Sequence, residues 1–157
     1  MSAVEDRLAE LGLSVPDVAQ PVAAYVPALR VGNLIFTSGQ LPMVSGALVR
    51  AGKVGTGEDA VSPEDAKRLA ETCALNAIAA VKSVIGDLDK VTRVVKVVGF
   101  VASDPAFTGQ PGVINGASEL LGKAFGDAGV HARSAVGVAV LPLDAPVEVE
   151  ITVSVQD

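Results

Sequence analysis

The sequence predicts an α+β fold in which two helices cover one face of a mixed β-sheet. Residues 147–155 alternate between apolar and polar side chains, which is typical of a strand with one buried face. Residues 91–102 form a β-branched run that is apolar on both faces in its second half, as expected of a central strand. A helix-start signal at residues 62–65 opens the clearest helical pattern. In chain order the segments read β-β-α-β-α-β-β after a short leading helix, which indicates an α+β layer.

Three segments precede the first long helix. Apolar residues at helical spacing predict a short helix over residues 4–12. Residues 22–30 and 33–38 are β-like runs around a turn-prone Val-Gly-Asn, and together they predict a hairpin. Residues 42–61 are rich in glycine and indicate a long loop with a brief strand at 47–50. Loops of this length are often functional or mobile.

The remaining elements follow from caps and periodicity. Ser62 is a helix N-cap followed by a proline and two acids, and the pattern that it opens stops at Gly86. A second helix is predicted over about residues 113–126 from its apolar spacing. Two strands, over 133–140 and 147–155, close the chain.

The whole chain, residues 1–157, is expected to form a single domain with an N-terminal helical extension over about residues 1–15, because domains commonly run to roughly 100–200 residues. Hydrophobic residues make up 50% of the chain, but only 3% of it is aromatic. So much aliphatic surface in a domain of this size favours a covering partner, most simply another copy of the chain. Since both helices are expected on one face of the sheet, the other face is where such a partner would bind.

Charge and residue usage exclude several classes of protein. The net charge is −6 and the 12 Lys and Arg residues are scattered, whereas nucleic-acid binding needs a concentrated positive face. The single cysteine, Cys73, excludes an intrachain disulfide and a thiolate metal cluster, and is expected to be a buried, inert thiol. No signal peptide is recognised, and the apolar stretches are broken by Gly, Asp and Lys. We therefore expect a cytoplasmic protein without membrane spans, metal or nucleic-acid partner.

Few residues offer chemistry of their own. No helix opens with a GxGxxG or GxxxxGK[ST] loop, and Ser38 in TSGQ is not a GxSxG nucleophile. Arg133 is the stronger candidate, because its guanidinium matches a carboxylate with paired donors and it lies at a strand start beside His131, the only histidine. Glu148 lies on the polar face of the last strand. From the order of residues alone, exposed strand charges are the simpler interpretation of both.

Three segments carry a family resemblance that changes this balance: YVPALRVGNLIFTSGQLP (25–42), DPAFTGQPGVINGASELLGKAFG (104–126) and ARSAVGVAVLPLDAPVEVEI (132–151). In order and nearly in spacing they resemble the RidA family of reactive-intermediate imine deaminases, also called YjgF and endoribonuclease L-PSP. The resemblance implies a chorismate-mutase-like α+β domain assembled as a homotrimer. Its sheets would face inward, and its clefts would lie at the subunit interfaces.

The same resemblance implies roles for individual residues. Arg133 would grip the carboxylate of a 2-imino or enamine acid and Glu148 would hold the attacking water, so these two are the expected catalytic residues. The expected substrate-binding residues are Tyr25, Ser38, Gly39, Asn115 and Ala135. The implied reaction is hydrolytic deamination to a 2-keto acid and ammonia. Its ligand is a small carboxylate-bearing metabolite, and no metal or organic cofactor is required.

Three departures from the family pattern keep other functions open. Gly137 stands where many relatives carry glutamate, the loop over 43–61 is longer than in compact members, and the N-terminal helix is extra. The main alternative is a non-enzymatic or regulatory trimer that senses a small carboxylate through Arg133. Ribonuclease activity is opposed by the acidic charge and the scarcity of aromatic residues. A purely structural interaction protein is the remaining alternative.

Overall fold

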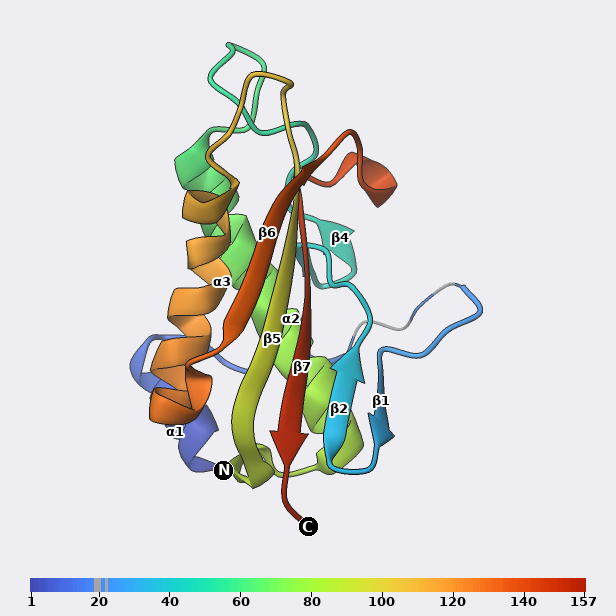
Figure 1. Cartoon of the computed structure of the whole chain (residues 1–157), viewed down its shortest axis with the longest axis vertical. Helices are drawn as coiled ribbons and strands as arrows, with labels where there is room; N and C mark the ends of the chain where they lie inside the picture. The colour runs from blue at the N-terminus through green and yellow to red at the C-terminus, as the bar shows by residue number, and fades with distance from the viewer. Residues whose placement is uncertain (19–20, 22) are drawn as a thin grey trace.

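Five strands form one mixed sheet with helices packed against it (Figure 1). The computed structural model describes residues 1–157 except residues 19–20 and 22. The sheet order is β1-β2-β7-β5-β6, in which β5 and β6 are parallel and the other neighbours are antiparallel. The five strands are β1 (Ala28–Val31), β2 (Leu34–Thr37), β5 (Val91–Ala102), β6 (Ala132–Val138) and β7 (Val147–Val155). A separate hairpin occupies part of the predicted long loop, and its strands are β3 (Met43–Val44) and β4 (Ala47–Leu48).

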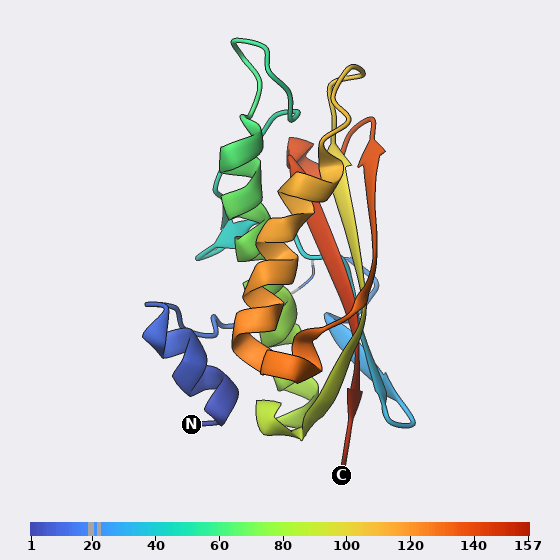
Figure 2. The same ribbon diagram turned by 60° about the vertical axis from the view of Figure 1, so that its left-hand side comes forward.

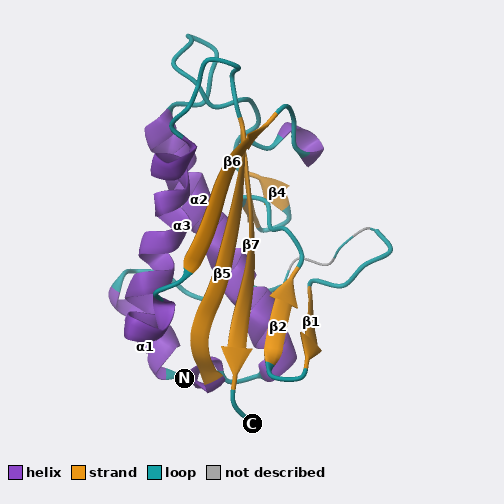
Figure 3. Cartoon of the chain, in the orientation of Figure 1, coloured by secondary structure: helices purple, strands orange, loops and turns teal. Residues whose placement is uncertain are grey.

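Helices cover only one face of the sheet, which we call the inner face (Figure 2). The two long helices are α2 (Pro63–Ile85) and α3 (Gln110–Phe125), and α1 (Ala3–Glu10) packs beside α3 on the side away from the sheet. Figure 3 shows the opposite, outer face of the strands without a covering helix. This arrangement confirms the predicted α+β layer. Among the residues that the structure describes, no helix has both the length and the apolar character needed to cross a membrane.

Local signals in the sequence set the ends of the long helices. Ser62 caps α2 by accepting a hydrogen bond from the backbone N–H of Asp65 at 3.1 Å, and Pro63 fills the first helical position, where no N–H is needed. The helix stops at Gly86, whose φ of +77° suits glycine. α3 begins at Gln110, earlier than the predicted residue 113, because Pro111 is well tolerated in the first turn of a helix.

The N-terminal helix is anchored to the rest of the domain at its first turn. Its predicted range, 4–12, is slightly too long, and Ser2 and Glu5 form a capping box at its start. The carboxylate of Asp89 accepts hydrogen bonds from two backbone N–H groups of this turn, at 2.9 and 3.3 Å. Glu5 also pairs with Lys82, and this contact, followed by the hydrogen bonds from Ser2, lowers the pKa of Glu5 to about 2.

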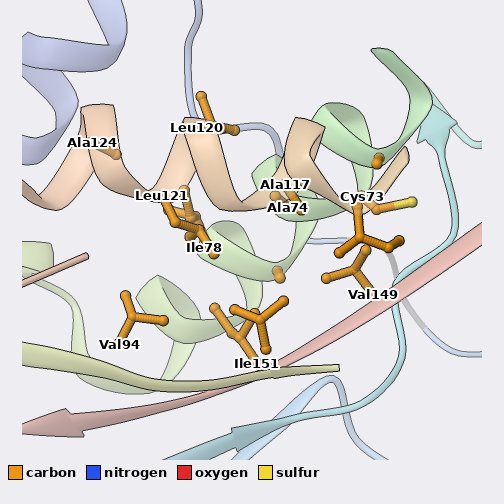
Figure 4. Packing of buried hydrophobic residues seen from close by; sticks show 14 of the residues in the cluster. Cys73, Ala74, Ile78, Val94, Ala117, Leu120, Leu121, Ala124, Val149 and Ile151 are labelled. Carbon is orange, nitrogen blue, oxygen red and sulfur yellow. The ribbon is translucent and has the colours of Figure 1, made fainter. Parts of the chain in front are cut away.

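The hydrophobic core lies between the helices and the inner face of the sheet (Figure 4). Ile78 of α2, Leu121 of α3, and Val149 and Ile151 of β7 are all buried there. Each buried Leu or Ile side chain stabilises the fold by roughly 1.5–3 kcal/mol relative to an exposed one. Small residues such as Ala74 let the two helices approach each other and the sheet closely.

Apolar side chains remain uncovered on the outer face. Leu29, Phe36 and Val136 are 48%, 40% and 44% exposed. They come from β1, β2 and β6, at positions that alternate with residues facing the helices.

The first predicted strand is wrong over most of its length. It was expected over residues 22–30, but β1 begins at Ala28, residues 23–25 form a bend, and residue 22 lies outside the described residues. Pro27 has no backbone N–H to give to a strand ladder. Its carbonyl instead accepts a hydrogen bond from the N–H of Ser38 at 2.8 Å, so this segment approaches the end of β2 as a loop.

Candidate functional site

Arg133 lies on the edge strand β6, and its side chain contacts α3. It pairs with Val97 of β5, which is fully buried on the inner face. Its Nη1 donates to Oδ1 of Asn115 at 2.8 Å and to Oγ of Ser118 at 3.3 Å. Its Nη2 donates to the carbonyl of Pro111 at 3.3 Å. Arg133 and Asn115, both predicted as site residues, are therefore in direct contact.

Two glycines bring α3 close enough for this contact. A Cβ atom at Gly99 of β5 would overlap the side chain of Ile114, and one at Gly116 would overlap the carbonyl group of Lys67 in α2. Without these side chains α3 seats against both the sheet and α2. Asn115 lies between the two contacts in the sequence, so its position relative to β6 is fixed.

The contacts of Arg133 leave one edge of its guanidinium for a ligand. A guanidinium has five N–H donors and no acceptor. Partners within the described chain use both donors of Nη1 and one of Nη2. The other two donors are on Nη2 and Nε, neighbouring nitrogens that match the two oxygens of a carboxylate. Ala135 follows Arg133 by two residues, so it lies on the same side of β6. It is half-buried and pairs with Gly99 of β5.

Gly137 continues this side of β6 and is coupled to the start of α3. A Cβ atom there would lie 2.8 Å from Nε2 of Gln110 and 3.1 Å from Oγ of Ser103. Those two groups are hydrogen-bonded to each other at 3.2 Å. Glycine at position 137, where many relatives carry glutamate, therefore leaves room for the side chain of Gln110.

Glu148 projects from β7 to the outer face, against Gly39. Its chain neighbours Val147 and Val149 are buried on the inner face, so the alternation of the strand turns Glu148 outward. A Cβ atom at Gly39 would overlap the Glu148 carboxylate, so glycine there lets the carboxylate keep this position. Burial, and after it the negative charge of Glu150, raise the pKa of Glu148 above its ordinary value of 4.5.

Ser38 comes between β2 and Gly39, and Tyr25 lies in the loop that precedes β1, next in sequence to a contact of Ser38. Oγ of Ser38 donates to the carbonyl of Val26 at 2.6 Å and so holds this loop. Tyr25 is 56% exposed. Cys73, beneath β7, is fully buried as predicted, and burial, followed by the charge of Glu148, raises the pKa of its thiol.

The predicted site residues thus fall into two groups. We call them the arginine group (Asn115, Arg133 and Ala135) and the glutamate group (Tyr25, Ser38, Gly39 and Glu148). Across β5, Glu148 lies level with Val136 of β6. Arg133 precedes Val136 by three residues on that strand, and β6 is two strands away from β7. Standard strand spacings make this about 10 Å along the strands and about 10 Å across them. The two groups also lie on opposite faces of the sheet, so one chain does not bring them together.

Sequence reasoning missed two partners of Arg133. Asn115 and Ser118 are three residues apart in a predicted helix, and this spacing places them on one helix face, so a signal for Ser118 was present. The carbonyl of Pro111 left no signal, because a backbone contact does not depend on residue type. A surface pocket of about 440 Å³ lies elsewhere, between Ser2, Lys82 and Asp89. The described residues include no group of three or more His, Cys, Asp or Glu side chains placed to hold a metal ion.

Known proteins are similar to this chain in sequence, and the similarity identifies its family. Residues 5–153 match the family model described as "YjgF/chorismate_mutase-like, putative endoribonuclease". The chain is 39% identical over 155 residues to Protein TCP17 of Trypanosoma cruzi, covering 98% of this chain and 95% of that protein. It is 32% identical over 145 residues to a 2-iminobutanoate/2-iminopropanoate deaminase of Dermatophagoides farinae, covering 92% of this chain and 95% of that protein.

A solved structure shows the same likeness in three dimensions. A protein of unknown function from Agrobacterium tumefaciens superposes with a TM-score of 0.90 at 47% sequence identity, covering 98% of this chain and 93% of that one. The family model spans nearly the whole chain, and the relatives are similar over nearly their whole lengths. The chain therefore belongs to the YjgF/chorismate-mutase-like family.

Proposed function

We propose that the protein hydrolyses 2-imino acids and their enamine tautomers to 2-keto acids and ammonia, in a cleft shared by two copies of the chain. The observation that carries the proposal is Arg133, whose guanidinium is held by Asn115 and Ser118 while its Nη2–Nε edge stays clear of them. The deaminase of Dermatophagoides farinae, at 32% identity, supports the substrate class.

Arg133 acts by fixing the substrate. Two parallel hydrogen bonds to the carboxylate set both the position and the plane of the adjacent imine carbon. Orientation of this kind removes part of the entropic barrier to attack by water. A nearby cation attracts the substrate even though the protein has a net charge of −6, because the Coulomb energy of a close pair outweighs that of distant, screened charges.

Glu148 acts on the water. As the water oxygen adds to the imine carbon, the electrons of the C=N bond move to nitrogen and the carboxylate accepts a proton from the water. Glu148 returns this proton to the nitrogen and is again a carboxylate. The hydroxyl hydrogen of the tetrahedral adduct then passes to the nitrogen, ammonia leaves, and the hydroxyl oxygen forms the keto group. The raised pKa of Glu148 makes this carboxylate a stronger base than an exposed glutamate.

A second copy has to supply one of the two groups, because in a single chain they lie on opposite faces. The apolar side chains that such a contact would cover are those of the outer face, Leu29, Phe36 and Val136. A homotrimer, which the family resemblance implies, would form three equivalent clefts by repeating one contact around an axis.

Turnover of imino acids generated in solution tests the proposed function. 2-Iminopropanoate and 2-iminobutanoate are produced by an auxiliary enzyme, and release of the keto acid is followed with and without the protein. We expect acceleration by the wild type and loss of at least about 100-fold of it in Arg133→Ala. Arg68→Ala is the matched control, because Arg68 forms an exposed ion pair with Asp65 on α2, away from both groups.

Two other results would replace the proposal. Binding of keto acids that depends on Arg133 without any acceleration would favour the non-enzymatic carboxylate sensor. Cleavage of RNA by a preparation free of contaminating nuclease, lost in Arg133→Ala, would favour the ribonuclease named in the family description.

A further inference from the structure

His131 lies beside the arginine group and has no role in the proposed reaction. It precedes Arg133 by two residues, and on an extended chain two such residues point to the same side. Its Nε2 lies 2.8 Å from Oγ of Ser118, the same hydroxyl that contacts Nη1 of Arg133. Its Nδ1 lies 2.6 Å from the carbonyl oxygen of Gly129. The imidazole is thus joined to the guanidinium through one serine.

For a neutral His131 ring, the hydrogen-bond partners set the direction of each proton in this chain of contacts. A guanidinium only donates, so Ser118 accepts from Arg133. A carbonyl only accepts, so Nδ1 of His131 carries a hydrogen and donates to Gly129. In a neutral ring Nε2 is then an acceptor, which takes the hydroxyl hydrogen of Ser118. Donation runs from Arg133 to Ser118, then to His131, then to Gly129.

The last acceptor is held rigidly. Gly129 is buried, and a Cβ atom there would overlap the carbonyl oxygen of Leu121, so the turn over residues 126–129 lies tightly on α3. Nη1 of Arg93, from β5, also donates to the carbonyls of Asp127 and Val130 at 2.7 and 3.0 Å. A fixed Gly129 carbonyl fixes the plane and the tautomer of the imidazole.

We propose that His131 is a positioning residue that sets the orientation of the Arg133 guanidinium through Ser118. The inference rests on the proposed function only in taking Arg133 as the group that binds a carboxylate. While His131 accepts the hydroxyl hydrogen, a lone pair of Ser118 stays directed at Nη1. Together with Asn115, Ser118 then engages both donors of Nη1, so the Nη2–Nε edge keeps one direction. Without that acceptor the hydroxyl rotates freely, and its hydrogen competes with Nη1.

Replacement of His131 in the full-length oligomer tests the inference, with pyruvate as an unreactive carboxylate probe. His131→Leu removes the acceptor, whereas His131→Gln places an amide oxygen near the position of Nε2. We expect pyruvate binding to weaken about tenfold in His131→Leu, which corresponds to about 1.4 kcal/mol, and to stay near the wild-type value in His131→Gln. For an imino acid, KM should rise in His131→Leu while kcat changes by less than about twofold.

A double-mutant cycle separates positioning from a merely structural role. On an Arg133→Ala background, His131→Leu should cause no further loss of pyruvate binding. Equal losses in His131→Leu and His131→Gln, or an additive loss on the Arg133→Ala background, would overturn the inference.

The ring itself gives a readout that does not depend on activity. Because His131 is the only histidine, nitrogen NMR of its imidazole is assigned without ambiguity. We expect the neutral tautomer to carry its proton on Nδ1, and a neutral tautomer with its proton on Nε2 instead would overturn the inference. Pyruvate binding through Arg133 with the expected His131 results, but without turnover, would contradict only the deaminase function. Pyruvate binding that survives Arg133→Ala would contradict both.

Discussion

Glu148 has the environment of a general base, because partial burial and the neighbouring charge of Glu150 both raise its pKa. Glu148→Gln keeps the shape of the side chain and removes the base, so we expect turnover to fall by at least about 100-fold. In the wild type the rate should fall as the pH drops through the raised pKa, which places the acid limb above the ordinary value of 4.5. A pH–rate profile of the wild type whose acid limb lies at or below 4.5 would contradict this assignment.

The same substitution should affect stability in the opposite sense to activity. The folded state binds the Glu148 proton more tightly than the unfolded state, so ionisation of this group costs stability above its folded pKa. Glu148→Gln should therefore raise the free energy of unfolding at neutral pH, by less than about 1 kcal/mol because the group is partly solvent-screened. The gain should vanish as the pH falls below the unfolded pKa, and thermal unfolding at several pH values measures it.

Gly39 tests the glutamate group without removing its carboxylate. In Gly39→Ala the new Cβ atom occupies the place of the Glu148 carboxylate and displaces it. A displacement of about 1 Å at a reacting group lowers the rate about 100-fold, and we expect a loss of that size in the imine assay. Gly57→Ala is the matched control, because nothing lies within 4 Å of the added Cβ atom there. Equal rates for the two variants would mean that Glu148 does not act from its position against Gly39.

At this scale the sequence predicted some contacts and not others. Arg133 and Asn115 were expected together from the family resemblance, and they are hydrogen-bonded. The link from Arg133 through Ser118 to His131 was not expected, since it depends on the rotation of α3 against β6. That rotation is set by the close approach of Gly99 and Gly116 to their neighbours, which a single sequence does not reveal.

Among the elements, α3 depends on its own Gly116 for close packing against α2. A Cβ atom at Gly116 would overlap the Lys67 carbonyl group in α2, whereas one at Gly122, in the same helix, meets nothing within 4 Å. We expect Gly116→Ala to lower the free energy of unfolding by about 1–3 kcal/mol through overpacking. Gly122→Ala should raise it by about 0.5–1 kcal/mol through helix propensity. Chemical denaturation measures both, and a stabilised Gly116→Ala would contradict the close helix contact.

Elements with strong local signals were predicted well, and those set by distant contacts were not. The alternation of residues 147–155 and the cap at Ser62 correspond closely to β7 and α2. The strand expected over 22–30 is mostly loop, because Ser38 draws its carbonyls to the end of β2. The hairpin of β3 and β4 was expected only in part, since its short strands have no periodicity to recognise. Asn76 of α2 supports this hairpin by donating to the carbonyls of Leu41 and Met43.

At the scale of the whole molecule, the two groups of site residues lie on opposite faces of the sheet. The arginine group lies between an edge strand and α3, and the glutamate group lies on the outer face. The expectation of a covered outer face came from composition, and the exposed Phe36 and Val136 are consistent with it. Composition alone did not predict that the catalytic candidates would be divided between two faces, because strand alternation fixes faces only after the register is known.

Recovery of activity in mixed oligomers tests the shared cleft most directly. Arg133→Ala and Glu148→Gln should each be nearly inactive alone. When the two variants are unfolded together in equal amounts and reassembled, a cleft is intact if its arginine comes from one variant and its glutamate from the other. With random assembly, half of the clefts receive an intact arginine and, independently, half receive an intact glutamate. Both are intact in about a quarter of the clefts, so we expect about a quarter of the wild-type rate. Mixed oligomers, verified by two affinity tags, that remain as inactive as the separate variants would contradict a cleft built from two copies.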